Sequence, residues 1–455
     1  MNSKTMTAIL AAAASVTLPA ASFAATPEVS GVTMTQATSS RLVTIGYTID
    51  SPAVVTLDVQ TNANTSAAAG DPGWTSIGGE AVCNAQGDVW KQVAAGARTI
   101  TWHPDLSWPD HKISGNGARA VVTAWALDNT PDYMVVDISA GAQQNTQKYY
   151  PAVEFLPGGL LTNDAYRKSM IVMRKIMAKD VTWTMGSTSL ETRERNATRE
   201  ATHQVTLTNN YYIGVFEITQ GQWALIKNTT PSSYALEDRS VHPVERVSYN
   251  SIRNSANNTA DATHDWPHEP HASSFLGLLH ARAGIWFDLP SEAQWEFAAR
   301  AGHGDTLWGD GSPITNSAHD ENLDLLGNYW YDGKDGVRTT AAVGSYAPNS
   351  WGLYDMHGNV EEWCLDWAED NIATAVDASG ELYGGRVNIE PSNSQAYLSG
   401  EAVPSDRDLA SRIVRGGCFD YNSGFARPAH RSQMTSYIPW SEAVGFRLVC
   451  TAGLQ

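Results

Sequence analysis

Basic residues are scarce in this sequence. Its 455 residues include 30 Lys and Arg against 48 Asp and Glu, which gives a formal net charge of −18. Such an excess of negative charge repels phosphate groups, so we expect no nucleic-acid partner and no attraction to anionic membranes. Long apolar runs are also missing after the N-terminal region, so the sequence predicts no transmembrane segment there.

Charged residues make up only 17% of the chain, whereas tryptophan (16 residues) and glycine (37 residues) are frequent. Disordered chains have the opposite bias, with many charges and few aromatic residues. The composition therefore indicates a loop-rich globular protein, and the length fits two or three domains.

Residues 1–24 have the pattern of a secretory signal peptide. Lys4 supplies the positive start, Ala8–Ala21 the apolar stretch and Ser22–Ala24 a small-residue cleavage site. A buried helix is the competing interpretation, but no capping residues frame the segment. No cysteine follows the apolar stretch, which argues against a lipoprotein. We therefore expect a periplasmic or secreted protein.

Cysteine is rare, and its four positions are Cys83, Cys364, Cys418 and Cys450. In an oxidising compartment cysteines can pair, and three of the four lie near the C-terminus. We expect a disulfide among these three, with the connectivity left open. Cys83 is expected to be an isolated buried thiol.

Residues 28–130 predict an all-β domain. Arg41–Ile49 and Ala53–Gln60 alternate apolar and polar residues, and further strands are expected at Ala97–Trp102 and Ala118–Leu127. Short strands at this spacing favour an immunoglobulin-like or fibronectin-like β-sandwich with a spacer, docking or carbohydrate-facing role. Residues 131–174 are interpreted as a linker.

The next segment predicts strands and capped helices. Strands are expected at 181–187 and 201–207, with the charged loop 191–200 between them. Thr219 is placed to cap one helix. Ser291 and Gln294 form a capping box at the start of another.

Four histidines lie in the segment 259–284, at His264, His268, His271 and His280. This density suggests zinc, but Pro267 and Pro270 break any helical register and no HExxH motif occurs. We interpret the segment as a solvated loop.

The stretch Gly352–Trp367, GLYDMHGNVEEWCLDW, is dense in Trp, Gly and carboxylates and has no clear period. In an extended chain, residues 358, 360 and 362 point the same way, so carbonyls and the carboxylates of Asp355 and Glu362 can surround a hard cation such as calcium. The alternative is that Asp355 caps a turn and Glu362 pairs with an arginine.

Several motifs occur in a fixed order along the C-terminal part of the chain. They are Thr184–Ser187, Phe216–Trp223, His242–Val244 with Val247–Ser248, Leu289–Glu296, Gly352–Trp367, Arg415–Gly417 and Gly445–Leu448. Together they resemble the formylglycine-generating enzyme family, also called sulfatase-modifying factors, over residues 175–452. The resemblance implies an α+β fold with little regular secondary structure, similar to C-type lectin-like domains.

The resemblance also implies two structural calcium sites. The first corresponds here to Asp355, Gly358, Val360 and Glu362. The second corresponds to Asn322 and Leu323 together with Asp335 and Val337. Val337 departs from the aromatic residue of the family, but its contribution would be a backbone carbonyl.

Enzymes of this family oxidise a sulfatase cysteine to formylglycine with a copper(I) ion held by two cysteines, a soft donor pair that suits copper(I). The matching positions are Tyr421 and Ala426. We therefore do not expect copper. Cys418 stands where the family has a serine, and it is the one candidate catalytic thiol.

These observations rank a binding or accessory module first, with a protein or glycan ligand and a sulfatase as candidate partners. The alternatives are a formylglycine-generating oxidase and another oxidoreductase on the same scaffold. Tyr, Asn and Arg are typical of adaptable contact surfaces. The expected ligand face comprises Phe419, Asp420, Tyr421, Asn422, Phe425, Arg427, His430, Arg431 and Tyr437.

Some of these residues have a structural interpretation as well. Four arginines of this region would then neutralise buried acid around Glu361, Glu362 and Asp366. They are Arg415, Arg427, Arg431 and Arg447.

The signal-peptide pattern predicts export with cleavage after Ala24. N-terminal sequencing of the protein purified from an expressing bacterium is expected to start at Ala25. An intact Met1 on protein recovered from the cytosolic fraction would contradict this prediction.

Overall fold

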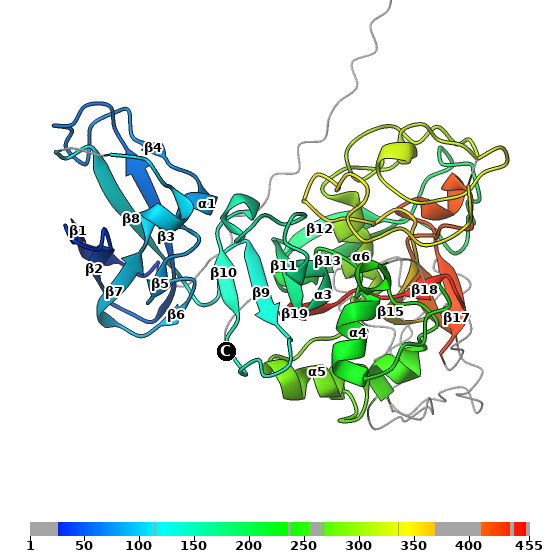
Figure 1. The fold of residues 1–455 in the computed structure, drawn as a ribbon. Helices are drawn as coiled ribbons and strands as arrows, with labels where there is room; N and C mark the ends of the chain where they lie inside the picture. Colours follow the sequence, from blue (N-terminus) through cyan, green and yellow to red (C-terminus); the bar gives the residue numbers. More distant parts are fainter. Residues whose placement is uncertain are drawn as a thin grey trace, which may run out of the picture.

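The computed structural model describes residues 26–112, 115–234, 238–254, 264, 268–334, 336–368, 411–436 and 441–451. Figure 1 shows a β-rich N-terminal domain in blue and a larger domain that contains the remaining helices and sheets. Within the described ranges, no helix has the length and apolar character needed to cross a bilayer.

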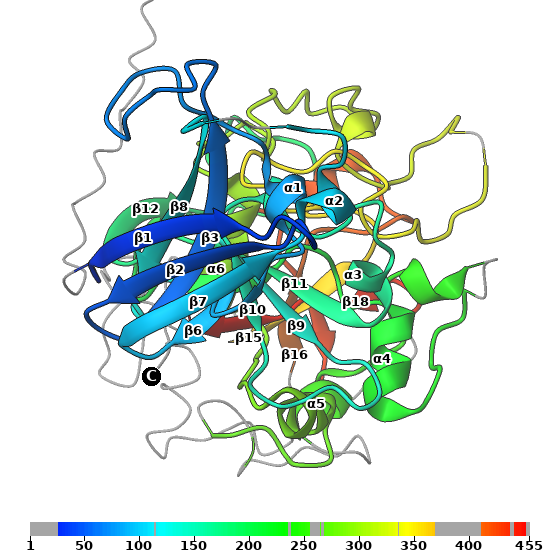
Figure 2. The same cartoon turned by 60° about the vertical axis from the view of Figure 1, so that its left-hand side comes forward.

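The N-terminal domain is a sandwich of two sheets. The first sheet has the strand order β1 (Val29–Gln36), β2 (Val43–Ile49), β7 (Gly96–Trp102) and β5 (Gln86–Gly87), with antiparallel pairing throughout. In Figure 2, β1, β2 and β7 lie side by side in front. The predicted alternation holds in β2, where Val43, Ile45, Tyr47 and Ile49 are all buried.

The second sheet is built on β3 (Ala53–Thr61). This strand pairs with β8 (Ala118–Trp125), β6 (Lys91–Val93) and β4 (Thr75–Ser76). Two short helices, α1 (Gly79–Val82) and α2 (Pro104–Ser107), complete the domain. Apolar side chains of both sheets, such as Ile45 and Leu57, share one core between them.

Residues 131–174 are not a linker, which corrects the sequence interpretation. They form β9 (Tyr133–Asp137), β10 (Lys148–Tyr150), η1 (Val153–Phe155), α3 (Ala165–Lys168) and most of β11 (Met170–Ile176). The strands enter a five-stranded sheet of order β10-β9-β11-β14-β19, where β14 is Tyr211–Gly214 and β19 is Val449–Thr451. Because β19 lies near the C-terminus, local sequence patterns do not show this pairing.

The larger domain has small sheets, short helices and long loops. The two predicted strands are present, and they pair as an antiparallel hairpin of β12 (Val181–Met185) and β13 (His203–Leu207). A four-stranded sheet has the order β17 (Ser432–Thr435), β16 (Ser411–Arg415), β15 (Glu361–Trp367) and β18 (Val444–Gly445). The described part of the chain thus confirms the α+β class with little regular secondary structure.

The main helices are α4 (Gln220–Lys227), α5 (Phe275–Ala283) and α6 (Glu292–Arg300). Shorter helical turns are η2 (Arg239–Val241), η3 (Asn250–Asn254), η4 (Leu323–Leu325) and η7 (Ser423–Ala426). Both predicted caps are confirmed, since Thr219 with Gln222 and Ser291 with Gln294 form reciprocal capping boxes.

The sandwich is packed against the larger domain. The ring of Trp90 in the sandwich packs at a tilt against that of Tyr150, with 5.3 Å between the ring centres, and the Trp90 carbonyl accepts the Tyr149 N–H at 2.8 Å. One apolar cluster continues from Leu57 of the sandwich to Phe216. Hydrogen bonds and shared apolar burial therefore hold the two domains together.

The cysteines contradict the expected disulfide. All four thiols are free, with Cys364, Cys418 and Cys450 buried and Cys83 partly exposed. Cys364 lies in β15, Cys450 in β19 and Cys418 in the turn after β16. Cys450 and Cys364 also belong to different apolar clusters, so each packs as a small apolar side chain.

Candidate functional site

The turn after β16 brings the predicted functional residues together. Gly416 and Gly417 have φ values of +98° and +68°, and a Cβ on Gly417 would lie 2.7 Å from the Phe425 carbonyl oxygen. Glycine is therefore required where the chain turns back on itself. The Gly416 carbonyl accepts the Gly358 N–H at 2.7 Å, and the Phe419 N–H donates to the Asn359 carbonyl at 2.9 Å. These bonds attach the turn to the segment 352–367.

The two positions that match the family cysteines have opposite environments. Tyr421 is 40% exposed, and its ring lies 4.8 Å from that of Phe425. Ala426 is fully buried in a small cluster with Trp308, Leu323, Leu326 and Tyr329. Position 421 therefore faces solvent, whereas position 426 is part of the core.

Cys418 is buried beneath this turn. Its carbonyl accepts the Tyr421 N–H at 3.2 Å. Burial raises the pKa of the Cys418 thiol well above its usual range, and the nearby charge of Glu361 adds to the rise. Because the thiolate is the reactive form of cysteine, this environment keeps Cys418 unreactive at neutral pH.

Sequence reasoning missed the interaction between Glu361 and Tyr421. The charge of Glu361 is the main cause that raises the pKa of Tyr421 to about 12. Burial raises the pKa of Glu361 itself to about 7, and its Oε1 has no hydrogen-bond partner among the described residues. A buried carboxyl group that titrates near neutrality thus lies close to an exposed phenol. The sequence did hold a signal for Glu361. In an extended segment successive side chains point to opposite faces, so Glu361 points away from the face of Val360 and Glu362.

Around Tyr421 the surface carries mixed polar and aromatic groups. Asp420 forms an ion pair with Arg338 at 2.8 Å, and the Arg338 guanidinium lies 4.6 Å over the ring of Trp330. The backbone N–H of Trp330 donates to the Tyr421 carbonyl at 2.8 Å. Asn422 caps η7 through its side-chain oxygen. We call Asp420, Tyr421, Asn422, Trp330 and Arg338 the Tyr421 face.

Four residues of the expected ligand face are buried, which corrects that part of the prediction. Phe419, Arg427, His430 and Arg431 are 3%, 0%, 7% and 6% exposed, so they cannot contact a ligand on the surface. Phe419 packs edge-on against Tyr234 at 5.2 Å. Tyr437 lies outside the described residues.

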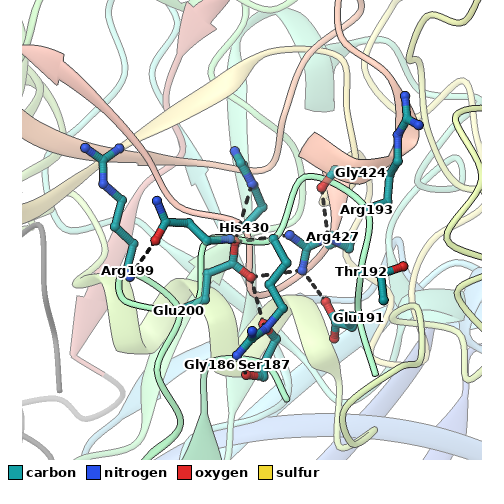
Figure 3. A network of polar contacts seen from close by, with 12 residues as sticks. Gly186, Ser187, Glu191, Thr192, Arg193, Arg199, Glu200, Gly424, Arg427 and His430 are labelled. Carbon is teal, nitrogen blue, oxygen red and sulfur yellow. Dashed lines mark hydrogen bonds and ion pairs between the residues drawn. The ribbon is translucent and has the colours of Figure 1, made fainter. Parts of the chain in front are cut away.

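Arg427 is the centre of the buried network in Figure 3. It lies between Glu191 and Glu200, pairing with Glu191 and with both oxygens of Glu200 at 2.9 and 3.1 Å. Its Nε donates to the Gly424 carbonyl at 2.9 Å. The charged loop 191–200 thus points two glutamates inward, where Arg427 attaches them to the turn that carries Tyr421.

The charges of this network nearly cancel. Burial raises the pKa of Glu191 to about 7, so this group carries a proton for part of the time near neutral pH. Burial lowers the pKa of His430 to about 3, so this ring is neutral. Arg427 and Glu200 then remain as the principal buried pair, with Ser187 donating to Glu200 at 2.7 Å.

The other three arginines also neutralise buried acid, as the structural interpretation predicted. Arg447 forms two bonds of 2.6 Å with Glu362, and Arg431 binds both oxygens of Glu292 at 2.5 and 2.8 Å. Arg415 pairs with Glu296 and Glu292. Of the expected acidic partners, Glu362 is the one bound directly in these pairs.

The first expected calcium set has buried oxygen ligands. Asp355 is 2% exposed; its Oδ2 accepts the Gly344 N–H at 2.7 Å, and its Oδ1 has no hydrogen-bond partner among the described residues. Glu217 and Glu362 are also buried, and their charges interact with that of Asp355. Arg447 offsets only one of these three carboxylates.

The unpartnered Oδ1 atom and the three buried carboxylates fit a bound cation at Asp355. Glu362, however, already has other partners. Both oxygens of Glu362 bind Arg447, and Oε2 also accepts Trp295 Nε1–H at 2.8 Å. In the described ranges, no three Asp, Glu, His or Cys side chains are grouped to hold a metal by themselves. A cation here would therefore depend on backbone carbonyls, as expected for Gly358 and Val360.

The second expected calcium set is only partly described. Leu323 is buried, and the Asn322 side chain donates to the Pro313 carbonyl at 2.8 Å. Val337 is 82% exposed. Asp335 lies outside the described residues.

Two residues of the histidine-rich segment have partners within the larger domain. His271 contacts Ser273, and His280 stacks on Trp286.

The fold and the glycine turn define an α+β domain of the formylglycine-generating-enzyme type. Residues 142–452 match the family model FGE-sulfatase, described as a sulfatase-modifying factor enzyme 1-like domain. The chain belongs to this family. The match begins at residue 142 and so includes β10 and β11. Both strands belong to the five-stranded sheet.

Individual relatives match over shorter segments. A formylglycine-generating enzyme of Thermomonospora curvata is 38% identical over 21% of this chain and 34% of its own length. The chaperone protein LppX of Paenibacillus barcinonensis is 32% identical over 35% of this chain and 63% of its own length. The chain thus spans less than two thirds of either relative.

Solved structures show similar chains at low identity. Treponema denticola variable protein 1 aligns with a TM-score of 0.41 and 24% identity, over 62% of this chain and 95% of that chain. PvdO from Pseudomonas aeruginosa aligns with a TM-score of 0.40 and 22% identity, over 62% and 94% of the two chains.

The network in Figure 3 predicts that two arginines near the turn differ in their effect on stability. Arg427→Met leaves Glu200 buried without its cation, so the free energy of unfolding is expected to fall by about 3–5 kcal/mol. Arg338→Met breaks an ion pair whose side chains are 48% and 43% exposed, with an expected loss below about 1 kcal/mol. Urea denaturation of both variants measures the difference. Equal losses would contradict the assignment of Arg427 to the buried network.

Proposed function

We propose that this protein is an exported binding or accessory member of the sulfatase-modifying factor family rather than a copper oxidase. The proposal rests on the side chains at positions 421 and 426, which match the two cysteine positions of the family. One holds an exposed tyrosine and the other a fully buried alanine.

The side chains at these positions do not suit copper(I). Two thiolates close together are the soft ligands that this ion prefers. The phenol of Tyr421 and the methyl group of Ala426 offer no soft donor, and the Tyr421 pKa is raised to about 12. Cys418 is the one thiol in the turn, and burial favours its protonated form.

The Tyr421 face suits the recognition of a ligand. Tyr421 and Trp330 supply large rigid rings, and Asp420, Asn422 and Arg338 supply hydrogen bonds and charge. Aromatic anchors with adaptable polar neighbours are typical of contact surfaces. The rigid network beneath the turn limits the entropy lost on binding, because its groups are already ordered. The ligand is a protein or a glycan, and a sulfatase chain is a candidate partner.

The relatives support both a sulfatase partner and an accessory role. Several carry the name formylglycine-generating enzyme, and one carries the name chaperone protein. A chaperone-type role needs a contact surface but no copper ligands. This fits a scaffold that keeps the family fold while its two cysteine positions hold other side chains.

Oxidation of sulfatase cysteines is the second candidate function, and one observation favours it. The chain shares its family with curated formylglycine-generating enzymes, and Cys418 is the one thiol in the turn. In this case Cys418 would be the reactive thiol. The two candidates differ in whether a substrate peptide is chemically changed.

Incubation of the protein with a Cys-x-Pro-x-Arg peptide, with and without copper(I), tests the proposal. We expect no conversion of the peptide cysteine to an aldehyde by mass spectrometry, because a second thiolate is missing from the turn. A double variant, Tyr421→Cys with Ala426→Cys, is expected to bind copper(I) more tightly than the wild type. The matched control is Ser432→Cys, which adds a thiol outside the turn.

One result would reverse this conclusion. If the wild-type protein gave the peptide the mass change of a thiol becoming an aldehyde, and Cys418→Ser abolished that change, the protein would be an oxidase with Cys418 as its catalytic thiol.

We also propose structural calcium at Asp355. The support is the buried Oδ1 atom without a hydrogen-bond partner and the excess of buried carboxylates around it. Asp355, Glu362 and the carbonyls of Gly358 and Val360 would hold the ion. Calcium would then supply positive charge that Arg447 alone does not provide.

Calcium is expected to raise the melting temperature of the wild-type protein, because an ion that binds only the native state stabilises it. Asp355→Asn should abolish the rise, whereas Asp420→Asn on the exposed face should retain it. Asp355→Asn is preferable to a Glu362 variant, since Glu362 also neutralises Arg447. An unchanged wild-type melting curve after chelation would contradict calcium binding.

A further inference from the structure

The sandwich contains a pocket that the proposed function does not use. It has a volume of about 640 Å³ and lies where the edge strand β1 approaches β8, with Met34 and Gln36 on one side and Arg119 on the other. The loops with Trp74, Trp108 and His111 complete its wall. This volume lies within the range of small-ligand sites. The Tyr421 face belongs to the other domain, so the two sites are separate.

One wall of the pocket is aromatic and rigid. Trp108 and His111 stack in parallel at 3.9 Å, and Trp102 stacks on Trp108 at 6.4 Å. Trp102 is 2% exposed and donates from Nε1 to the Ala81 carbonyl at 2.9 Å. Tryptophan joins a broad apolar face to a polar N–H. Such faces pack well against the C–H surfaces of sugar rings.

Arg119 provides a positively charged group on the opposite wall. Its guanidinium lies 4.4 Å over the ring of Trp74. Nε and Nη2 donate to the Gln60 side-chain oxygen at 2.9 and 2.6 Å, and Nη1 donates to the Ala69 carbonyl. These acceptors are neutral. They hold the guanidinium in place and leave two of its five N–H donors for a ligand.

The charge of the pocket is opposite to that of the chain. Arg119 and His111 are its ionisable lining residues, and no acidic side chain lies among the described residues that line it. The whole chain, in contrast, has a net charge of −18. A positive site on an acidic protein favours a ligand group with negative charge.

We infer that this pocket binds an acidic carbohydrate, a sugar that carries carboxylate or sulfate groups. The ring of Trp74 would pack against the sugar, and the side chains of Gln36 and Asn116 would bond its hydroxyl groups. Arg119 would bind the anionic group through a charge-assisted hydrogen bond. A carboxylate is a planar oxyanion and a sulfate group is a compact tetrahedral one. Each offers oxygen acceptors that the same guanidinium can bind.

Calorimetric titration of the full chain with three oligosaccharides of equal length tests this inference. The probes are an oligogalacturonate, a sulfated galactan oligosaccharide and a neutral galactan oligosaccharide. We expect at least one acidic probe to bind, with the neutral probe about tenfold or more weaker. The acidic probe that binds more tightly identifies carboxylate or sulfate as the preferred group.

Two variants locate the binding site. Arg119→Gln and Trp74→Ala are each expected to weaken the acidic probe about tenfold or more. The matched control is Arg98→Gln, because Arg98 lies in the same sandwich and bonds only to the Ala94 and Ala95 carbonyls in the structure. Melting curves verify that each variant is folded. If Arg119→Gln does not fold, Trp74→Ala on its loop still tests the pocket.

Several outcomes would overturn the inference. Equal affinity for the neutral and acidic probes would refute the role of charge. Unchanged binding by folded Trp74→Ala and Arg119→Gln would place the ligand elsewhere. Absence of binding by all three probes would refute a carbohydrate ligand.

Discussion

Buried arginines hold the larger domain together. Arg447 is fully buried, and its guanidinium binds Glu362 of β15 and the carbonyls of Gly214 and Tyr354. A domain with many loops has many backbone carbonyls that no helix or sheet satisfies, and each costs free energy if buried without a donor. Arginine offers five N–H donors in a planar arrangement, so one side chain can satisfy a carboxylate and two carbonyls.

The same constraint shapes the turn that carries the site. Arg427 pairs with two glutamates from the loop 191–200, and Arg431 pairs with Glu292 at the start of α6. Buried ion pairs therefore hold the underside of the turn in place. On its other side, Tyr421 is exposed beside Asp420 and Asn422. A scaffold of this kind can change its surface residues without losing its fold, because the stabilising contacts lie below them.

The two domains carry two different surfaces. They contact each other directly, because Trp90 packs on Tyr150 and Lys175 binds the carbonyl of Thr130. The Tyr421 face carries both signs of charge, whereas the described lining of the sandwich pocket holds Arg119 and no acidic side chain.

Local patterns in the sequence identified those features that depend on neighbouring residues alone. The Ser291 and Gln294 capping box, the β2 alternation and the ordered motifs identified helices, strands and family correctly. The identities of Tyr421 and Ala426 were visible without coordinates. Other features became visible in the folded chain alone: residues 131–174 share a sheet with β14 and β19, Arg427 and His430 are buried, and the cysteines are unpaired. The physical reason is distance along the chain. Arg427 is buried because Glu191 and Glu200 meet it from more than two hundred residues away, and no local pattern records such a contact.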